Sequence, residues 1–281
     1  MSGYRMQTAS DVQTAVVPAA GAGTRWLPLT TAVPKELLPV VDRPAMHWIL
    51  DEAVRCGIGR VILVTAPGKD SLTRYASQAA AGFPVVEVVV QPEPLGLGDA
   101  VRRALPLIAD EAAVAIMLPD NLFDEEPLPL TRMITTYRQQ RCSVLALMAC
   151  PADEIGQHGA AAVSYEGEVA RVTNVVEKPG QEQSAGRLAV VGRYVLTQAV
   201  LAHLTRLRPA RAGEYQLTDA IAAALPGERV VGVRIRRAVH DVGSPGNWLK
   251  TQLRMGSRDM NLEPRLRQAL AAGAALLDRD D

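Results

Sequence analysis

The amino-acid sequence predicts an α/β protein with a doubly wound, mostly parallel sheet. Short apolar runs alternate with amphipathic helical segments through the first half of the chain. Several of these runs are apolar throughout, as expected of parallel strands that helices cover on both faces. With 281 residues, of which 48% are hydrophobic and 21% are charged, the chain has room for one large domain or two unequal ones.

The first half follows this alternation in order. Strands are expected at 14–20, 60–66, 84–91 and 112–120, of which the first two are expected to be buried, and helices at 44–57, 69–82 and 99–108. Gly57 and Gly82 end the first two helices, and Asp99 begins the third as its N-cap. A helix at 130–140 and a strand at 143–150 continue the pattern.

The pattern changes from about residue 158. Strands joined by turns are expected at 159–179 and 187–197, before helices return at 214–225, 247–256 and 264–277. This half predicts a smaller mixed β layer that closes over the edge of the parallel sheet. The whole is a Rossmann-like α/β fold with a mixed β layer and C-terminal helices.

Composition excludes several classes of partner. Thirty Lys and Arg residues balance thirty Asp and Glu residues, so no bulk positive field attracts nucleic acid or an acidic membrane surface. No segment reaches the apolar length of a membrane span, and the first residues lack the apolar core of a signal peptide. Cys56, Cys142 and Cys150 form no CxxC pair and are expected to be reduced thiols. We therefore expect a cytoplasmic protein.

The stretch "AAGAGTRWLPLTTAVPKELLP", residues 19–39, places a glycine turn directly after the first strand. A dinucleotide fingerprint needs a third glycine where Trp26 stands, and a P-loop needs a Gly-Lys-Ser/Thr sequence that is missing. The backbone N–H groups of such a turn can still hold a phosphate or a base edge. Arg25 and Lys35 can add two cations to a polyphosphate. A glycine pair alone would equally fit a surface turn; the whole string favours a phosphate site.

This string resembles the N-terminal signature of the nucleoside-diphosphate-sugar pyrophosphorylases, and most specifically their bacterial uridylyltransferase branch. The resemblance resumes at "QPEPLGLGDAV", "LPDNLFDE", "VVEKP", "VVGRYVL", "GEYQLTDAI" and "HDVG", and thus covers residues 14–257. It implies a nucleotide-binding half at about 14–150 and a sugar-binding half at about 151–257. Residues 258–281 are then a C-terminal helical tail.

The resemblance also implies a reaction and its partners. UTP and α-D-glucose 1-phosphate would give UDP-glucose and pyrophosphate by Mg²⁺-assisted in-line attack on the α-phosphorus. The attacking oxygen is already anionic, so alignment and charge neutralisation suffice without a Ser/His/Asp arrangement. Family members imply a homo-oligomer, either a dimer or a tetramer. Two alternatives stay open: a thymidylyltransferase that makes dTDP-glucose, and a non-catalytic regulatory paralogue.

The charged site residues follow from the same resemblance. Asp120 closes an apolar strand at the edge where open α/β sheets bind ligands, and Asp241 matches the family's second Mg²⁺ carboxylate. Arg25 and Lys35 act as catalytic cations on the triphosphate side, and Lys178 grips the phosphate of the sugar substrate. Either aspartate taken alone would equally fit a helix cap or a turn.

Further positions are expected to contact the substrates. The amide of Gln91 can both donate and accept, which suits the O4 and N3–H edge of uracil or thymine. Gly96 lies beside the base, where a side chain would collide, and Glu177 accepts hydrogen bonds from sugar hydroxyls. Positions that bind through the main chain are Ala20, Gly21 and Gly23 on the nucleotide side and Gly159 on the sugar side.

Three departures from the family pattern bear on substrate preference and assembly. The segment between "GKDSLTRYA" and Gln91 is several helical turns shorter than in familiar bacterial enzymes, where it contributes to a subunit-facing surface. Asp99 stands where His is common in "GLGHA", and His158 stands where Tyr commonly precedes Gly159. Both positions lie at the rim of the expected nucleotide or sugar site.

Overall fold

The protein is described here by a computed structural model. It describes residues 12–78, 83–151, 154–167, 169–180, 187–210, 213–236 and 239–277. Four parallel strands form one half of its central sheet: β1 (Thr14–Pro18), β4 (Arg60–Thr65), β5 (Val85–Val90) and β6 (Ala113–Met117). Each lies within the range expected from its apolar run, so the parallel half of the prediction is confirmed.

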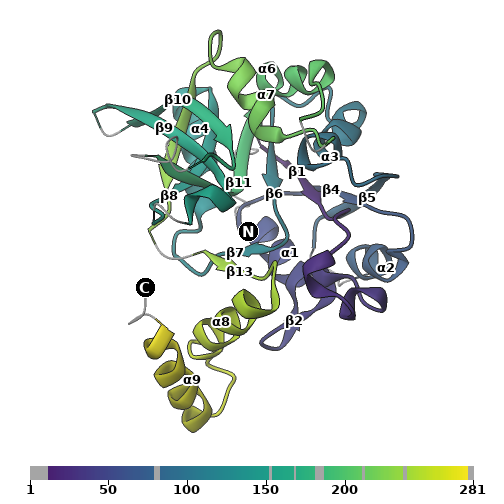
Figure 1. Ribbon diagram of the computed structural model, residues 1–281, viewed down its shortest axis with the longest axis vertical. Helices are drawn as coiled ribbons and strands as arrows, with labels where there is room; N and C mark the ends of the chain where they lie inside the picture. Colours follow the sequence, from purple (N-terminus) through teal and green to yellow (C-terminus); the bar gives the residue numbers. More distant parts are fainter. Residues whose placement is uncertain are drawn as a thin grey trace, which may run out of the picture.

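The remaining strands of the sheet are β8 (Ser143–Met148), β9 (Gly159–Glu166), β10 (Val169–Glu177), β11 (Leu188–Thr197) and β12 (Val230–Arg234). In the described residues the nine strands lie in the order β5-β4-β1-β6-β11-β8-β12-β10-β9 (Figure 1). β11 runs antiparallel to both of its neighbours, β6 and β8. β9 pairs with β11 as well as with β10.

The mixed strands expected after residue 158 are present, but they do not lie over the edge of the parallel sheet. The strands of the second half continue the parallel sheet, and the pairings of β11, β8, β12, β10 and β9 close into a ring. The position of β11 in the sheet explains why residues 187–197 are mostly apolar. β11 is buried along almost its whole length because it lies in the middle of the sheet rather than at an edge.

Helices cover both faces of the sheet, as the doubly wound prediction requires. Their bounds are α1 (Ala45–Arg55), α2 (Asp70–Gln78), α3 (Leu97–Ala104), α4 (Pro129–Gln140), α6 (Gln198–Leu201), α7 (Leu217–Ala224), α8 (Pro245–Gly256) and α9 (Pro264–Leu277). Ala15 and Val17 of β1 pack into the core with α1 and α4. Val16, between them, packs into a second core with α3 and α7. Successive side chains of a strand point to opposite faces, so α1 and α4 cover one face and α3 and α7 the other.

Short elements connect these layers. Single 3₁₀ turns are η1 (Thr24–Trp26), η2 (Leu29–Thr31), η3 (Lys35–Leu37), η4 (Leu105–Leu107), η5 (Ile155–Gln157) and η6 (Ala202–Arg206). Two small antiparallel pairs join β2 (Pro39–Val40) to β3 (Arg43–Pro44) and β7 (Asn121–Leu122) to β13 (His240–Asp241).

Helix ends test two of the three expected caps. Gly57 follows α1 with φ +80°, as a glycine at a helix C-terminus does. The expected end at Gly82 lies outside the described residues. Asp99 is not an N-cap: α3 begins two residues earlier, and its N-cap is Gly96 with φ +93°. The Asp99 side chain is instead fully buried inside the first turn of α3.

The C-terminal helices stand apart from the sheet at one end of the molecule (Figure 1). α8 and α9 pack against each other, with a Cβ built on Gly256 lying only 2.9 Å from Leu270 Cδ1. Within the described part of the chain, none of the helices is long and apolar enough to cross a membrane. All three cysteines are free thiols, as expected from their spacing.

Candidate active site

The glycine turn lies directly after β1, at the carboxyl end of the strand. Gly23 has φ +67°, and a Cβ on it would lie 2.9 Å from Thr30 Cγ2, so this position favours glycine. The Lys69 ammonium donates hydrogen bonds to the carbonyl oxygens of Ala19 (2.6 Å) and Gly21 (2.8 Å). The shape of the turn therefore depends on a lysine from the next β–α connection.

Lys69 is in turn held by Glu36. Its Nζ lies 3.0 Å from Glu36 Oε2, and the Glu36 side chain is almost fully buried. Burial lowers the pKa of Lys69, and the Glu36 carboxylate only partly offsets this effect. Neither residue was expected from the sequence, although the Gly68-Lys69 pair after the second strand was a visible signal.

A cavity of about 450 Å³ opens beside this turn. Six of the expected residues line it, namely Ala20, Gly21, Lys35, Gln91, Gly96 and Asp120. Gly23 shapes the turn without lining this cavity. We call it the nucleotide cavity, and a second one below the sugar cavity, after the ligands that the family resemblance implies.

Lys35 and Asp120 form an ion pair at the inner end of the nucleotide cavity. Lys35 Nζ lies 2.6 Å from Asp120 Oδ2, and both side chains are largely buried. Burial alone would lower the pKa of Lys35, but the charges of Asp120 and Glu36 raise it above its usual value. Burial alone would raise the pKa of Asp120, but Lys35 holds it below its usual value. Both groups are therefore charged at neutral pH.

Asp241 is brought to Asp120 by the pairing of β7 with β13. Asp241 lies opposite Asn121 in this pair, and the Val242 N–H donates to the Asp120 carbonyl oxygen at 2.9 Å. A Cβ on Gly243 would lie 2.9 Å from Asp241 Oδ1 and 3.5 Å from Asp120 Oδ2. The two expected carboxylates, 121 residues apart in sequence, thus converge around one glycine.

The Asp241 carboxylate is oriented by its own loop. Oδ1 accepts from the Gly243 N–H at 2.6 Å, and Oδ2 accepts from Asn247 Nδ2 at 2.5 Å. Across the described residues, no group of three or more His, Cys, Asp or Glu side chains is placed to hold a metal ion. Two carboxylates on one opening still form the oxygen donor set of a hard divalent cation that takes its other ligands from phosphate and water.

A second cavity of about 330 Å³ lies beyond Asp120, and we call it the sugar cavity. Gly159 and Glu177 are directly opposite each other on β9 and β10. Glu177 Oε2 accepts a hydrogen bond from Thr218 Oγ1 at 3.0 Å. A Cβ on Gly159 would lie 2.8 Å from Thr218 Cγ2, so this wall has room only for glycine. Thr218 was not expected, although it lies inside the quoted string "GEYQLTDAI".

Lys178 enters the sugar cavity from the turn after β10. Its backbone has φ +42°, and its N–H donates to the His158 carbonyl oxygen at 3.0 Å. Arg25 lines the same cavity rather than the nucleotide cavity. Its guanidinium lies close to the two carboxylates, because a Cβ on Gly243 would also be 3.2 Å from Arg25 Nη2. The sequence had assigned Arg25 to the triphosphate side alone; the structure places it where the two cavities meet.

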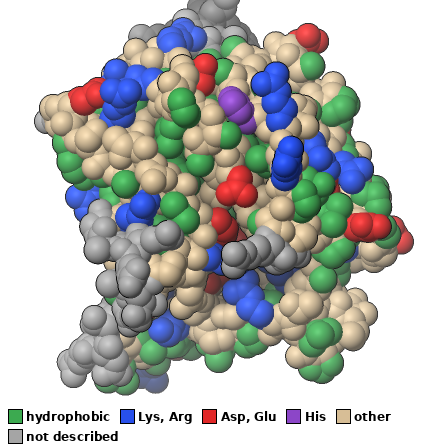
Figure 2. All heavy atoms as spheres, turned by 45° about the horizontal axis from the view of Figure 1, so that its top comes forward, with side chains coloured by type: hydrophobic (Ala, Val, Ile, Leu, Met, Phe, Trp, Pro, Cys, Tyr) green, Lys and Arg blue, Asp and Glu red, His purple; other side chains and the backbone are tan. Residues whose placement is uncertain are grey.

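The two cavities share four lining residues, which are Leu97, Leu118, Asp120 and Glu214. Figure 2 shows acidic and basic side chains gathered in a hollow near the middle of one face of the molecule. Glu214 accepts from Gln216 Nε2 at 2.9 Å, and both residues line the sugar cavity. Two ligands bound in the two cavities would therefore meet beside Asp120.

The loop that carries Asp120 is fixed from behind by Arg193. Its guanidinium donates to the carbonyl oxygens of Leu118 (3.0 Å) and Asn121 (2.9 Å), on either side of Asp120. Arg193 is fully buried and forms two hydrogen bonds with the carboxylate of Glu52 in α1. The string "VVGRYVL" contained this arginine, but nothing in the sequence pointed to its partner.

At the end of the nucleotide cavity where the base is expected, the Gln91 amide differs from the prediction. The amide nitrogen of Gln91 donates to Asp99 Oδ2 at 2.8 Å and to the Gly96 carbonyl oxygen at 3.1 Å. Both N–H bonds of the amide are therefore used within the protein. Gln91 can offer only its carbonyl oxygen to a base, whereas the sequence analysis expected it to donate as well as accept.

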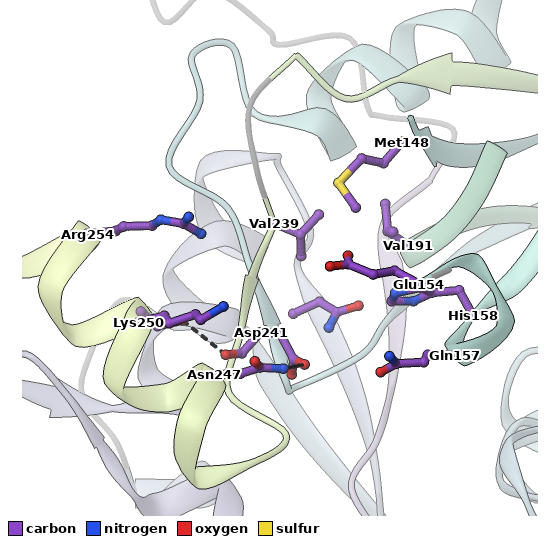
Figure 3. A pocket seen from close by; sticks show the side chains of 12 residues that line it. Met148, Glu154, Gln157, His158, Val191, Val239, Asp241, Asn247, Lys250 and Arg254 are labelled. Atoms are coloured by element: carbon purple, nitrogen blue, oxygen red, sulfur yellow. Dashed lines mark hydrogen bonds between the residues drawn. The ribbon is translucent and has the colours of Figure 1, made fainter. Parts of the chain in front are cut away.

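A third cavity of about 240 Å³ continues from the sugar cavity toward α8. Lys250 and Arg254 of α8 lie on one side of it, and Glu154 and His158 lie on the other (Figure 3). Asp241 lines both this cavity and the sugar cavity. His158, the departure noted in the sequence, therefore stands at the border between these two cavities.

Comparisons with known proteins identify the family of this chain. The family model described as nucleotidyl transferase matches residues 14–257. The UTP–glucose-1-phosphate uridylyltransferase of Streptococcus pneumoniae is 35% identical over 270 residues, covering 87% of this chain and 90% of that protein. The UTP-bound UGPase of Acinetobacter baumannii superposes with a TM-score of 0.82 at 32% identity, over 92% of this chain and 98% of that one. A UDP-glucose pyrophosphorylase complexed with UDP-glucose gives the same TM-score at 29% identity, over 88% of this chain and 100% of that one.

Proposed function

The chain belongs to the nucleotidyl transferase family, and we propose that it joins UTP and α-D-glucose 1-phosphate to give UDP-glucose and pyrophosphate. The uridylyltransferase from Streptococcus pneumoniae supports this choice of substrates, because it is 35% identical over most of both chains. The related structures with UTP and with UDP-glucose support it further. On this proposal residues 14–257 are the catalytic domain, with a nucleotide half to about 150, and 258–281 are a helical tail.

The observation that carries the proposal is the pair of cavities that meet at Asp120. A nucleotide in the first cavity would present its α-phosphate near Asp120, and a sugar phosphate in the second would face it. Arg25 and Lys178 line the sugar cavity, while Lys35 lines the nucleotide cavity. Cations therefore flank the junction from both sides.

This arrangement suits displacement at phosphorus without a general base. The attacking phosphate oxygen is already an anion, so the protein has to align two anions that repel each other. Lys178 would hold the phosphate of glucose 1-phosphate, and Glu177 would accept hydrogen bonds from sugar hydroxyls. Arg25, at the junction, would neutralise charge that develops on the transferring phosphoryl group. Pyrophosphate would leave toward the glycine turn and Lys35.

Asp120 and Asp241 are proposed to hold Mg²⁺. Their carboxylates converge around Gly243 and present oxygen atoms only, which fits a hard cation that shares phosphate oxygens. The ion would supply neutralisation of phosphate charge. Lys35 is bonded to Asp120, so it would also hold this carboxylate in its ionised form.

Two other functions are kept as alternatives. A thymidylyltransferase would use the same cavities, and the contact offered by Gln91 treats uracil and thymine alike. A non-catalytic regulatory paralogue would be expected to lack part of the charged set. The set that argues against it comprises Arg25, Lys35, Asp120, Lys178 and Asp241, all of which line the joined cavities.

The decisive experiment measures pyrophosphate release with a panel of nucleoside triphosphates and sugar 1-phosphates. UTP with glucose 1-phosphate should give the highest kcat/KM, and omission of the sugar phosphate should abolish release. A higher kcat/KM with dTTP would favour the thymidylyltransferase. If the protein binds UTP but releases no pyrophosphate with any of the sugar phosphates, the regulatory paralogue would be favoured.

Assembly and location stay predictions. The homo-oligomer, a dimer or a tetramer, rests on the family resemblance, and sedimentation velocity would test it. A cytoplasmic location is supported by the three free cysteines, which suit a reducing compartment. No nucleic-acid or membrane partner is proposed for a chain with equal numbers of basic and acidic residues.

A further inference from the structure

Asp99 is a buried acid in the nucleotide half to which no role in the reaction is assigned. Its side chain has no exposed surface, and Oδ2 accepts from the Gln91 amide nitrogen at 2.8 Å. On its other side, Oδ1 accepts from Arg102 Nη2 at 2.5 Å, and Arg103 Nε lies 3.4 Å from Oδ2. The carboxylate thus connects two arginines of α3 with the glutamine at the base end of the nucleotide cavity.

The arginine side of this chain of contacts is itself held in place. The Arg102 guanidinium stacks 4.5 Å from the centre of the Tyr215 ring. The Tyr215 carbonyl oxygen accepts from the Gly98 N–H at 2.7 Å, in the first turn of α3. A Cβ on Gly98 would lie only 2.8 Å from this oxygen, so the helix and the Tyr215 segment are in close contact. Asp99 therefore has little freedom to rotate away from Gln91.

The orientation of the Gln91 amide follows from its neighbours. Asp99 Oδ2 and the Gly96 carbonyl oxygen are both acceptors, and Gln91 Nε2 lies within hydrogen-bond distance of both. A flipped amide would place its oxygen against two other oxygens, and both contacts would be repulsive. Burial alone would raise the pKa of Asp99, but bonds from Gln91 and Arg102 hold it below its usual value. The carboxylate stays an acceptor at neutral pH.

Resting on the proposed function, we propose that Asp99 is a positioning residue that sets the polarity of the base site. It holds the Gln91 amide nitrogen inside the protein, so that Gln91 Oε1 alone faces the nucleotide cavity. Among the described residues, nothing donates to this oxygen, and it is not one of the fully buried unpaired atoms.

Base chemistry then decides which nucleotide fits. Uracil and thymine carry a single donor on their pairing edge, N3–H, between two carbonyl acceptors. Cytosine has an unprotonated N3 acceptor at that position. An acceptor fixed opposite N3 therefore binds UTP and dTTP alike and rejects CTP, because two acceptors would face each other. The discrimination is made at N3 and not through the 4-position oxygen, which needs a donor other than Gln91.

The test is the Asp99→Asn variant, in which the two side chains have nearly the same shape. Arg102, which donates to Oδ1, would keep the amide oxygen of the new side chain, so its nitrogen would take the place of Oδ2 and face Gln91. Each orientation of the Gln91 amide would then make one favourable contact and one repulsive one, with the new nitrogen and the Gly96 carbonyl oxygen, so the amide would no longer be fixed and could present Nε2, a donor, to the cavity. We expect the ratio of UTP to CTP affinity, measured by calorimetry without sugar phosphate, to fall by about tenfold or more.

Two further variants separate positioning from a general structural effect. Gln91→Ala should lower the ratio too, and adding Asp99→Asn to it should change the ratio by less than about twofold, because Asp99 acts through Gln91. Asp110→Asn is the matched control, since Asp110 is an exposed aspartate after η4 with no contact to the base end. It should leave the ratio at the wild-type value.

The opposing outcomes are distinct. If Asp99→Asn weakens UTP and CTP equally, the residue only supports the fold and the inference is wrong. If the wild-type protein binds neither nucleotide, the inference and the proposed function fail together. If the ratios of UTP to CTP affinity change as expected but no sugar phosphate gives pyrophosphate release, the inference about Asp99 is supported and only the proposed reaction is wrong.

Discussion

The nucleotide side and the sugar side of the site are built in different ways. On the nucleotide side the charged and amide groups are already bonded to one another; the pairs are Lys35 with Asp120, Lys69 with Glu36, and Gln91 with Asp99. On the sugar side, the Lys178 ammonium has no hydrogen-bond or ion-pair partner within the described residues. Glu177 there accepts only from the neutral hydroxyl of Thr218.

The difference indicates how each side recognises its ligand. Paired groups are held in one geometry before the ligand arrives, which suits the selection of a base and the shaping of a phosphate turn. An unpaired ammonium carries its full charge toward the ligand, which suits the capture of a small dianion. A substitution on one side should therefore leave ligand binding on the other side unchanged. Four predictions follow, in order of expected effect, and the first concerns the residue that both sides share.

The largest effect should come from the acid shared by both sides. Asp120→Asn keeps the shape of the side chain but removes the charge that pairs with Lys35 and faces Asp241. Turnover in the pyrophosphate-release assay should fall by about a thousandfold, as for other groups that stabilise the reacting phosphoryl charge. Asp241→Asn should act similarly, and chelation of divalent cations should silence the wild-type enzyme until excess Mg²⁺ is added.

The exposed Asp110→Asn variant serves as the control and should retain wild-type turnover. Circular dichroism should show that all three proteins are folded. Unchanged activity in a folded Asp241→Asn protein would remove this carboxylate from the reaction.

Next in size is the loss of the unpaired cation. Lys178→Ala should raise the KM for glucose 1-phosphate and lower kcat, because the ammonium both binds and aligns the phosphate. We expect kcat/KM to drop by about a hundredfold. UTP binding, measured by calorimetry, should change little, because the paired side is intact.

Arg171→Ala offers a matched control on β10, the strand that leads to Lys178, since the Arg171 side chain is half exposed and, within the described residues, pairs with Glu166 alone at the surface. It should leave all kinetic constants near their wild-type values. A Lys178→Ala protein that loses UTP binding and keeps its KM for the sugar phosphate would reverse the division into two sides.

A smaller effect is expected behind the glycine turn. Lys69→Met removes the donor to the carbonyl oxygens of Ala19 and Gly21, so the turn would lose its fixed shape. The KM for UTP should rise about tenfold, since a displaced phosphate turn misaligns the nucleotide. The KM for glucose 1-phosphate is the internal control and should stay constant. An equal rise in both constants would indicate a general loss of structure instead.

The smallest expected effect is on the free energy of unfolding, through the pH-dependent contribution of Asp99 on the nucleotide side. Because the pKa of Asp99 is lowered in the folded protein, the unfolded chain takes up the proton at higher pH than the folded one. The pair therefore stabilises the fold above the ordinary carboxylate pKa and loses this contribution as pH falls through the lowered value. At pH 7, Asp99→Asn should reduce the free energy of unfolding by about 1 kcal/mol in urea titrations.

That difference between wild type and variant should shrink below about pH 4, where the Asp99 carboxyl begins to protonate in the unfolded chain but not yet in the folded one. A difference that stays constant from pH 7 to the acid limit would mean that the charge of Asp99 adds nothing to stability. The UTP to CTP preference of the wild type should meanwhile be flat from pH 8 to pH 6, where neither the Asp99 carboxylate nor N3 of the two bases changes its protonation state.

Much of the parallel half could be predicted from the sequence. A strand that helices cover on both faces needs an uninterrupted apolar run, and the runs that end at Pro18, Thr65 and Met117 carry that signal directly. The run at 187–197 carries the same signal for another reason. It lies antiparallel in the middle of the sheet, and burial on both faces is all that the pattern reports.

In the site, too, the local sequence predicts which residues are present but not which groups they contact. Asp99 looks like a helix cap because it begins a helical pattern, and only its burial against Gln91 and Arg102 gives it another role. Arg25 follows the glycine turn in sequence but lies at the junction with the sugar cavity. Neither the burial of Asp99 nor the position of Arg25 could be predicted from hydrophobic periodicity.

By itself, the sequence determined most of the long strands and helices, although not β12, as well as where the glycine turn falls and which charged residues were candidates for the site. Those properties depend on neighbours a few residues away, through strand and helix periods and turn geometry. The tertiary structure alone decided which groups are paired, because Gln91 with Asp99, Glu36 with Lys69 and Lys35 with Asp120 are separated by 8, 33 and 85 residues. Contacts over such separations are created by packing, and packing is what divides this site into a paired side and an open one.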